Sequence, residues 1–153
     1  MGEEQKDVLV HVFAEILEQL AFMFAEPPEG EVSPPTSAAL ARASMGFKGP
    51  FEGKMEIVVP RDMCEELAAN VLGLEPDDEM VQRAPFDALK ELLNVTCGNV
   101  LTTIAGDEPV FDLTIPEVEE LDPSTWPDML ARPGTVCYLV EDYAVLLHLE
   151  SNG

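Results

Sequence analysis

The chain has 153 residues, of which 46% are hydrophobic. It is therefore long enough to bury a core but too short for two ordinary domains. Thirty acidic residues against eight basic ones give a formal net charge of -22, which turns the electrostatic attraction behind most nucleic-acid binding into repulsion. We expect one domain over residues 1–153 that does not bind nucleic acid.

The sequence also argues against a membrane protein. Glu15, Glu18 and Gln19 interrupt the most apolar segment, residues 8–24, and the sequence has no run of eighteen or more uncharged apolar residues. The first residues are acidic, unlike the basic start of a secretory signal peptide. Cys64, Cys97 and Cys137 are widely spaced among apolar neighbours, as expected for reduced thiols in a core. We therefore expect a cytoplasmic protein.

The first half of the chain predicts a helix, a loop, a hairpin and a second helix. Residues 7–25 carry apolar side chains at helical spacing. Residues 26–37 contain four prolines and three glutamates and predict a flexible, exposed loop. Alternating apolar residues at 39–47 and 51–59, on either side of a Lys-Gly-Pro turn, predict a β-hairpin. A shorter helix should follow, with Gly73 near its end as a C-terminal cap.

The second half is dominated by a long predicted helix. It should follow Pro85, because proline is favoured at the first helical position, and end at Gly106. Its buried stripe is expected to comprise Phe86, Leu89, Leu93, Cys97, Val100 and Ile104. Three further segments are predicted beyond it: a strand at 110–115, an irregular acidic connection at 116–133, and a closing hairpin formed by 135–140 and 143–149.

This order of elements predicts an α+β fold. Long helices should pack on an antiparallel sheet, and the helix-plus-strands unit recurs as two degenerate halves.

Four residues of the long helix form a line on one face. Asp87, Glu91, Asn94 and Gly98 are spaced by four, three and four residues, away from the apolar stripe. Asn and Gly in a helix interior each cost roughly 0.5–1 kcal/mol relative to Ala, so their presence requires a reason. One interpretation is structural: Gly98 admits another element, while Asn94 and Asn99 bond to nearby backbone. The other interpretation is a functional site.

The segment 87–99 resembles the signature helix of the CheC, CheX and FliY family of chemotaxis phosphatases. The family pattern has an acidic or Ser residue, Glu four residues later, Asn three residues after that, and often Gly-Asn behind it. A proline follows downstream, and Pro116 fills that place one residue closer than the usual spacing. In the first predicted helix, Glu15 is followed at the Asn position by Glu18. One active centre is therefore expected, which is typical of the CheX type.

The resemblance implies a CheX-like fold and a hydrolase that acts on a response regulator. The protein would remove the phosphoryl group from the phosphoaspartate of a CheY-like regulator in chemotaxis, a form of two-component signalling. Glu91 and Asn94 occupy the catalytic positions: Asn94 would hold the attacking water, and Glu91 would pair with the regulator's active-site lysine. Asp87 and Gly98 would belong to the surface that binds the partner.

The resemblance also bears on cofactors and assembly. No cofactor or metal is expected in this chain, because the magnesium ion belongs to the regulator, and because His11 and His148 are single and distant. A homodimer paired through sheet edges is implied, although residues 116–133 could cover such an edge. The alternative function is a non-catalytic receiver-binding or flagellar-switch adaptor with the same fold.

Overall fold

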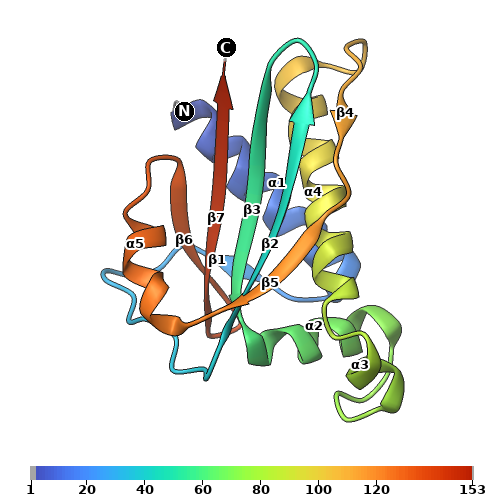
Figure 1. Ribbon diagram of the computed structural model, residues 1–153, viewed down its shortest axis with the longest axis vertical. Helices are drawn as coiled ribbons and strands as arrows, with labels where there is room; N and C mark the ends of the chain where they lie inside the picture. The colour runs from blue at the N-terminus through green and yellow to red at the C-terminus, as the bar shows by residue number, and fades with distance from the viewer. Residues whose placement is uncertain (1–2, 153) are drawn as a thin grey trace.

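The computed structural model describes residues 3–152 as an antiparallel sheet with helices on both of its faces (Figure 1). The helices are α1 (Glu3–Ala21), α2 (Arg61–Leu72), α3 (Glu79–Arg83), α4 (Asp87–Ala105), the 3-10 turn η1 (Pro123–Thr125) and α5 (Trp126–Leu130). The strands are β1 (Ala25–Glu26), β2 (Leu40–Lys48), β3 (Glu52–Pro60), β4 (Asp112–Leu113), β5 (Glu117–Leu121), β6 (Thr135–Val140) and β7 (Tyr143–Asn152). Within residues 3–152, no helix has both the length and the apolarity to cross a membrane.

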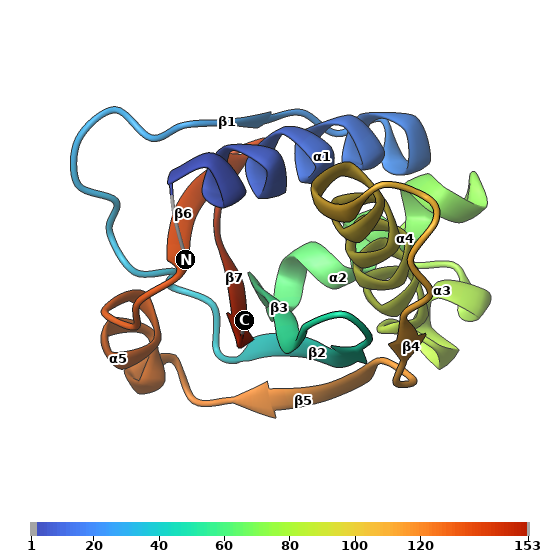
Figure 2. The same ribbon diagram turned by 90° about the horizontal axis from the view of Figure 1, so that it is seen from above.

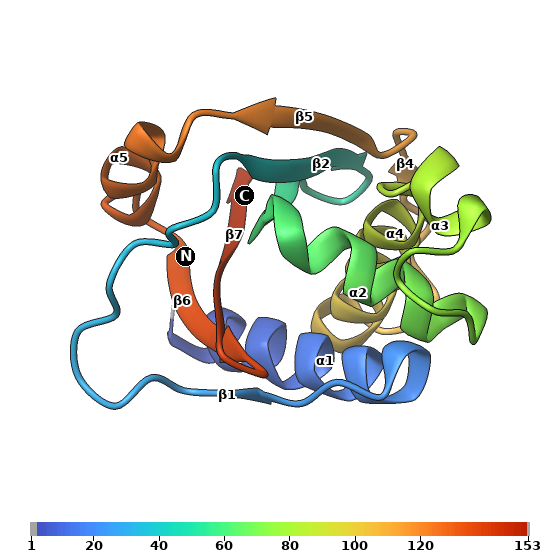
Figure 3. The same ribbon diagram turned by 90° about the horizontal axis from the view of Figure 1, so that it is seen from below.

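The sheet runs β1-β6-β7-β3-β2, and both β4 and β5 pair with the far side of β2. It curves around α1, α2 and α4, which fill its inner face (Figures 2 and 3). On the outer face, α5 covers a smaller apolar cluster that includes Val58 and Leu146. These two residues alternate with Ile57 and Leu147 of the main core, as the pleat of a strand requires.

The predicted fold class is confirmed. Helices α1 and α4 each have 19 residues, and hairpins β2–β3 and β6–β7 follow them in the two halves of the chain. Gly73 closes α2 in the left-handed conformation at φ 70°, as predicted for a C-terminal cap.

Helix α4 follows its predicted stripe closely. Leu89, Leu93, Cys97 and Val100 are fully buried against the main core. The helix ends before Gly106, as predicted, but it begins at Asp87, so Pro85 lies ahead of the helix rather than at its first position.

The N-terminal helix is shorter at its end than predicted. It stops at Ala21 because Phe22 adopts φ 55°, a left-handed conformation that turns the chain. Phe24, which lies within the predicted helix at residues 7–25, is consequently outside the helix and exposed, and the chain continues into β1. Residues 27–39 contain neither helix nor strand, in agreement with the predicted loop.

The predicted irregular connection at residues 116–133 was wrong. It contains β5, which pairs along β2, followed by η1 and α5. Two acidic residues of β5 pair with cations of neighbouring elements, Glu119 with Arg42 and Glu120 with Arg61. These ion pairs allow a carboxylate-rich segment to form an edge strand. Conversely, of the strand predicted at 110–115, only Asp112–Leu113 forms a strand, β4, which pairs with β2.

Candidate functional site

Helix α4 presents the polar line to solvent. Asp87, Glu91 and Asn94 are exposed, and Gly98 is partly exposed. The apolar stripe of the same helix anchors it to the core from the opposite side, so the line is held on a rigid element. The prediction that these four residues share one outward face is confirmed.

The structural interpretation of this line holds for one residue but not for the others. Asn99 donates a hydrogen bond from Nδ2 to the Val95 carbonyl at 2.8 Å, which explains an asparagine there. Within residues 3–152, the side chains of Asn94 and Glu91 make no hydrogen bond or ion pair. A Cβ built on Gly98 would have no atom of another element within 4 Å, so no other element packs against this position. Packing therefore explains neither Asn94 nor Gly98.

A groove of about 480 Å³ separates the polar line from the chain that leads into β5. We call residues 112–116 the strap, since they pass alongside α4 (Figure 1). The groove is lined on the helix side by Asp87, Lys90, Glu91 and Asn94, and on the strap side by Leu113, Thr114, Ile115 and Pro116. Pro116, the downstream position of the family pattern, thus lies across the groove from Glu91 and Asn94.

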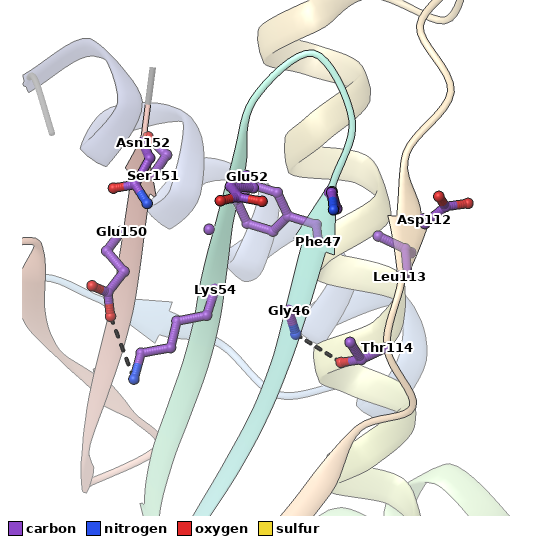
Figure 4. Close-up of a pocket in the computed structure, with 12 residues that line it drawn as sticks. Gly46, Phe47, Glu52, Lys54, Asp112, Leu113, Thr114, Glu150, Ser151 and Asn152 are labelled. Atoms are coloured by element: carbon purple, nitrogen blue, oxygen red, sulfur yellow. Dashed lines mark hydrogen bonds and ion pairs between the residues drawn. The ribbon is translucent and has the colours of Figure 1, made fainter.

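Two hydrogen bonds fix the strap to the sheet. Thr114 accepts from the Gly46 amide through Oγ1 at 2.8 Å (Figure 4). Its own amide donates to the Gly46 carbonyl at 2.9 Å. We call these two hydrogen bonds the clamp. Because they fix Thr114, they also hold its neighbours Leu113 and Ile115 in place. The width of the groove is therefore set by the sheet as well as by α4.

A larger hollow of about 590 Å³ lies on the other side of the strap (Figure 4). Lys54 and Glu150 form an ion pair at 3.4 Å in its lining, and Gly46 and Gly53 contribute only backbone there. Leu113 and Thr114 border both depressions, but none of the four residues of the polar line borders this one. Asp87, Glu91 and Asn94 therefore face the smaller groove and not the larger hollow.

The groups available at the α4 groove are two carboxylates, a carboxamide and the Lys90 ammonium. Cys97 is on the buried side of α4, where burial raises the pKa of its thiol to about 12, so it is no nucleophile at neutral pH. Within the described residues, no three His, Cys, Asp or Glu side chains are grouped to hold a metal ion. The site is suited to positioning and hydrogen bonding rather than to covalent catalysis.

Sequence reasoning missed the apolar side of the groove. Leu113 and Ile115 were assigned to a regular strand, with no sign that both would be exposed. Their equal parity around Thr114 was the available signal, because a strand places such residues on one face. The pattern could not show which face, since that depends on the clamp to Gly46.

Comparisons with known proteins bear on the fold and the family of the chain. A family model described as chemotaxis phosphatase CheX matches residues 42–137. CheX from Vibrio vulnificus superposes with a TM-score of 0.73 at 17% identity over 97% of each chain. A CheC-like superfamily protein from Shewanella sp. PV-4 gives 0.73 at 15% identity over 100% of each chain. The CheX–CheY–BeF3–Mg complex from Borrelia burgdorferi gives 0.65 at 16% identity over 97% of each chain.

At these identities the solved structures show the fold alone, and no curated protein sequence matches the chain. The family model, in contrast, spans more than half of the sequence and includes the whole of α4, the strap and β5. The protein therefore belongs to the CheX family of chemotaxis phosphatases.

Proposed function

We propose that this chain is a phosphatase that hydrolyses the phosphoaspartate of a CheY-like response regulator in chemotaxis signalling. The observation that carries the proposal is the exposed pair Glu91 and Asn94, one helical turn apart at the edge of the groove. Within residues 3–152 their side chains make no hydrogen bond or ion pair. A relative of the same fold was solved as a complex of CheX with CheY, beryllofluoride and magnesium.

Asn94 is suited to hold the attacking water. Phosphoaspartate is an acyl phosphate, and in this proposal the regulator supplies the magnesium ion and the lysine that neutralise its phosphoryl oxygens. What remains is to place a water in line with the bond that breaks. A carboxamide both donates and accepts hydrogen bonds without ionising, so Asn94 can orient water beside a negatively charged group.

Glu91 is suited to set the register of the two proteins. It lies one turn from Asn94 on the same exposed face of α4. Its carboxylate would pair with the lysine of the regulator's active site, which fixes how deeply Asn94 enters the phosphorylated pocket. Such charge pairing controls orientation more than it controls the chemical step.

Replacing Glu91 with glutamine should therefore weaken binding of the phosphorylated regulator. We expect KM to rise roughly 30-fold, equivalent to about 2 kcal/mol, because the lysine loses its ionic partner at the interface. Steady-state assays of phosphoryl loss give this value. Glu108→Gln removes the same charge from an exposed loop outside the groove, and it should leave KM unchanged. An equal rise in both variants would show that net charge, rather than Glu91, governs binding.

Gly98 and Asp87 extend the proposed partner surface along α4. Gly98→Ala should raise the free energy of unfolding by about 0.5–1 kcal/mol, because alanine is the better helix residue and the added Cβ has no atom of another element within 4 Å. If the regulator packs against the bare backbone at this position, the same methyl group raises KM severalfold. Denaturant titration and kinetics on one preparation check both effects, and a stabilised variant with unaltered KM would place Gly98 outside the interface.

The proposed function is tested by following the phosphoryl group on a labelled CheY-like regulator from the same organism. Addition of the chain should accelerate loss of the label well beyond the regulator's own rate. Co-sedimentation with the regulator but no acceleration would support the non-catalytic adaptor instead. If the chain neither binds the regulator nor accelerates loss of the label, both functions are refuted for that regulator.

A further inference from the structure

The strap carries an exposed apolar ridge beside the polar line. Ile115 is 85% exposed and Leu113 is 41% exposed, although both are large hydrophobic residues. Both line the α4 groove together with Pro116, across from Glu91 and Asn94. We call Leu113, Ile115 and Pro116 the apolar ridge.

The apolar ridge cannot withdraw into the core. Thr114, between Leu113 and Ile115, is hydrogen-bonded to Gly46 through both its amide and its hydroxyl group. Ile115 also borders a second depression, on the outer sheet face. Its side chain therefore lies between that depression and the α4 groove. Exposed apolar side chains that are fixed beside a groove mark a site of association with another molecule.

Charge limits what that molecule can be. The chain carries a formal charge of -22. The helix side of the groove has two carboxylates, Asp87 and Glu91, against the single ammonium of Lys90. A second copy would bring the same excess of negative charge to this face, which disfavours self-association here. A phosphorylated regulator instead presents cations, a metal ion and a lysine, toward Glu91 and Asn94.

We propose that the apolar ridge is a docking element that packs against uncharged surface bordering the phosphorylated pocket of the regulator. The inference rests on the proposed function and adds to it that the two sides of the groove have different roles. The helix side supplies the groups that act on the phosphoryl centre, and the strap side supplies apolar contact that holds the two proteins together. Ile115, as the most exposed member, makes the largest contribution.

The test compares two serine substitutions at equally exposed, β-branched apolar residues. Ile115→Ser removes the crest of the ridge, whereas Val110→Ser changes a residue that is 81% exposed but lies outside the groove lining. For Ile115→Ser we expect KM for the phosphorylated regulator to rise roughly tenfold to a hundredfold, from loss of one buried aliphatic side chain. The value of kcat should stay within about twofold, because serine at position 115 leaves the groups on α4 in place. Val110→Ser should match the wild type in both constants.

A direct binding measurement separates this inference from the proposed catalysis. Titration of each variant with a beryllofluoride-loaded regulator reads affinity without turnover, so it remains informative even if the chain proves inactive as an enzyme. Weaker binding for Ile115→Ser than for Val110→Ser supports the ridge. Equal affinities overturn it. Loss of a wild-type dimer in Ile115→Ser, with affinity for the regulator unchanged, would also overturn it by assigning the ridge to self-association.

Discussion

Replacement of Asn94 with alanine is expected to lower the rate of regulator dephosphorylation by on the order of 100-fold or more, with little change in KM. The variant loses the only carboxamide on the helix side of the groove, and misplacing a reacting group by about 1 Å already costs roughly 100-fold. The fold should be unaffected, because Asn94 is exposed and without a hydrogen bond within residues 3–152. Single-turnover decay of the phosphorylated regulator measures the rate.

The helix offers a matched control for this substitution. Asn99→Ala removes the same side chain from the same helix, but there the amide is engaged with the Val95 carbonyl. Asn99→Ala should retain the wild-type rate. Equal losses in the two variants would indicate a general disturbance of α4. Full activity in Asn94→Ala would show that another residue orients the water.

The second large effect is on stability, and it concerns a buried carboxylate on the outer sheet face. Glu56 is 3% exposed and is paired with Arg132 at 2.6 Å and with Lys54 at 3.5 Å. Arg132→Met should lower the free energy of unfolding by about 3 kcal/mol, because it leaves a buried charge with one partner fewer. Denaturant unfolding at neutral pH measures the loss.

A double variant separates the unpaired charge from lost packing. In Glu56→Gln combined with Arg132→Met no buried carboxylate remains, so the double variant should be more stable than Arg132→Met alone. If the two were equally unstable, the loss would come from the arginine's packing and not from its charge.

The same pair predicts how stability depends on pH. Burial acts to raise the pKa of Glu56, but the hydrogen bond and charge of Arg132, with the charges of Lys54 and Arg42, outweigh it and hold the pKa below 4.5. A carboxyl group with a lowered folded-state pKa contributes stability above its unfolded-state pKa and loses it as pH falls through the folded-state value. The wild type should therefore lose stability below about pH 4.5 more steeply than Glu56→Gln does. Parallel curves would contradict the assignment.

The sequence was sufficient to predict α4 and its polar line. The helix is a long element whose buried stripe recurs at helical spacing, and tertiary contacts only confirmed what periodicity implied. The exposed position of Glu91 and Asn94 followed from the same argument, because residues opposite the stripe must face away from the core.

The strap side of the groove could not be predicted in the same way. Strand β5 has the sequence Glu-Val-Glu-Glu-Leu, a composition with low strand propensity. The strand is stabilised by ion pairs with Arg42 and Arg61, which lie far from it in the sequence. The exposed position of Ile115 likewise depends on the clamp between Thr114 and Gly46, which are 68 residues apart. Local patterns carry no information about such long-range pairs. The sequence alone therefore could not predict the groove, because one of its two sides depends on these long-range pairs.

The most direct test of the central claim is multiple turnover. The chain is mixed at about one tenth of the concentration of phosphorylated regulator, and released inorganic phosphate is followed until the regulator is exhausted. An enzyme that acts through the exposed face of α4 should release many equivalents of phosphate per chain, at a rate proportional to its concentration. Phosphate release that stops after one equivalent, or that proceeds at the regulator's own rate, would contradict the account.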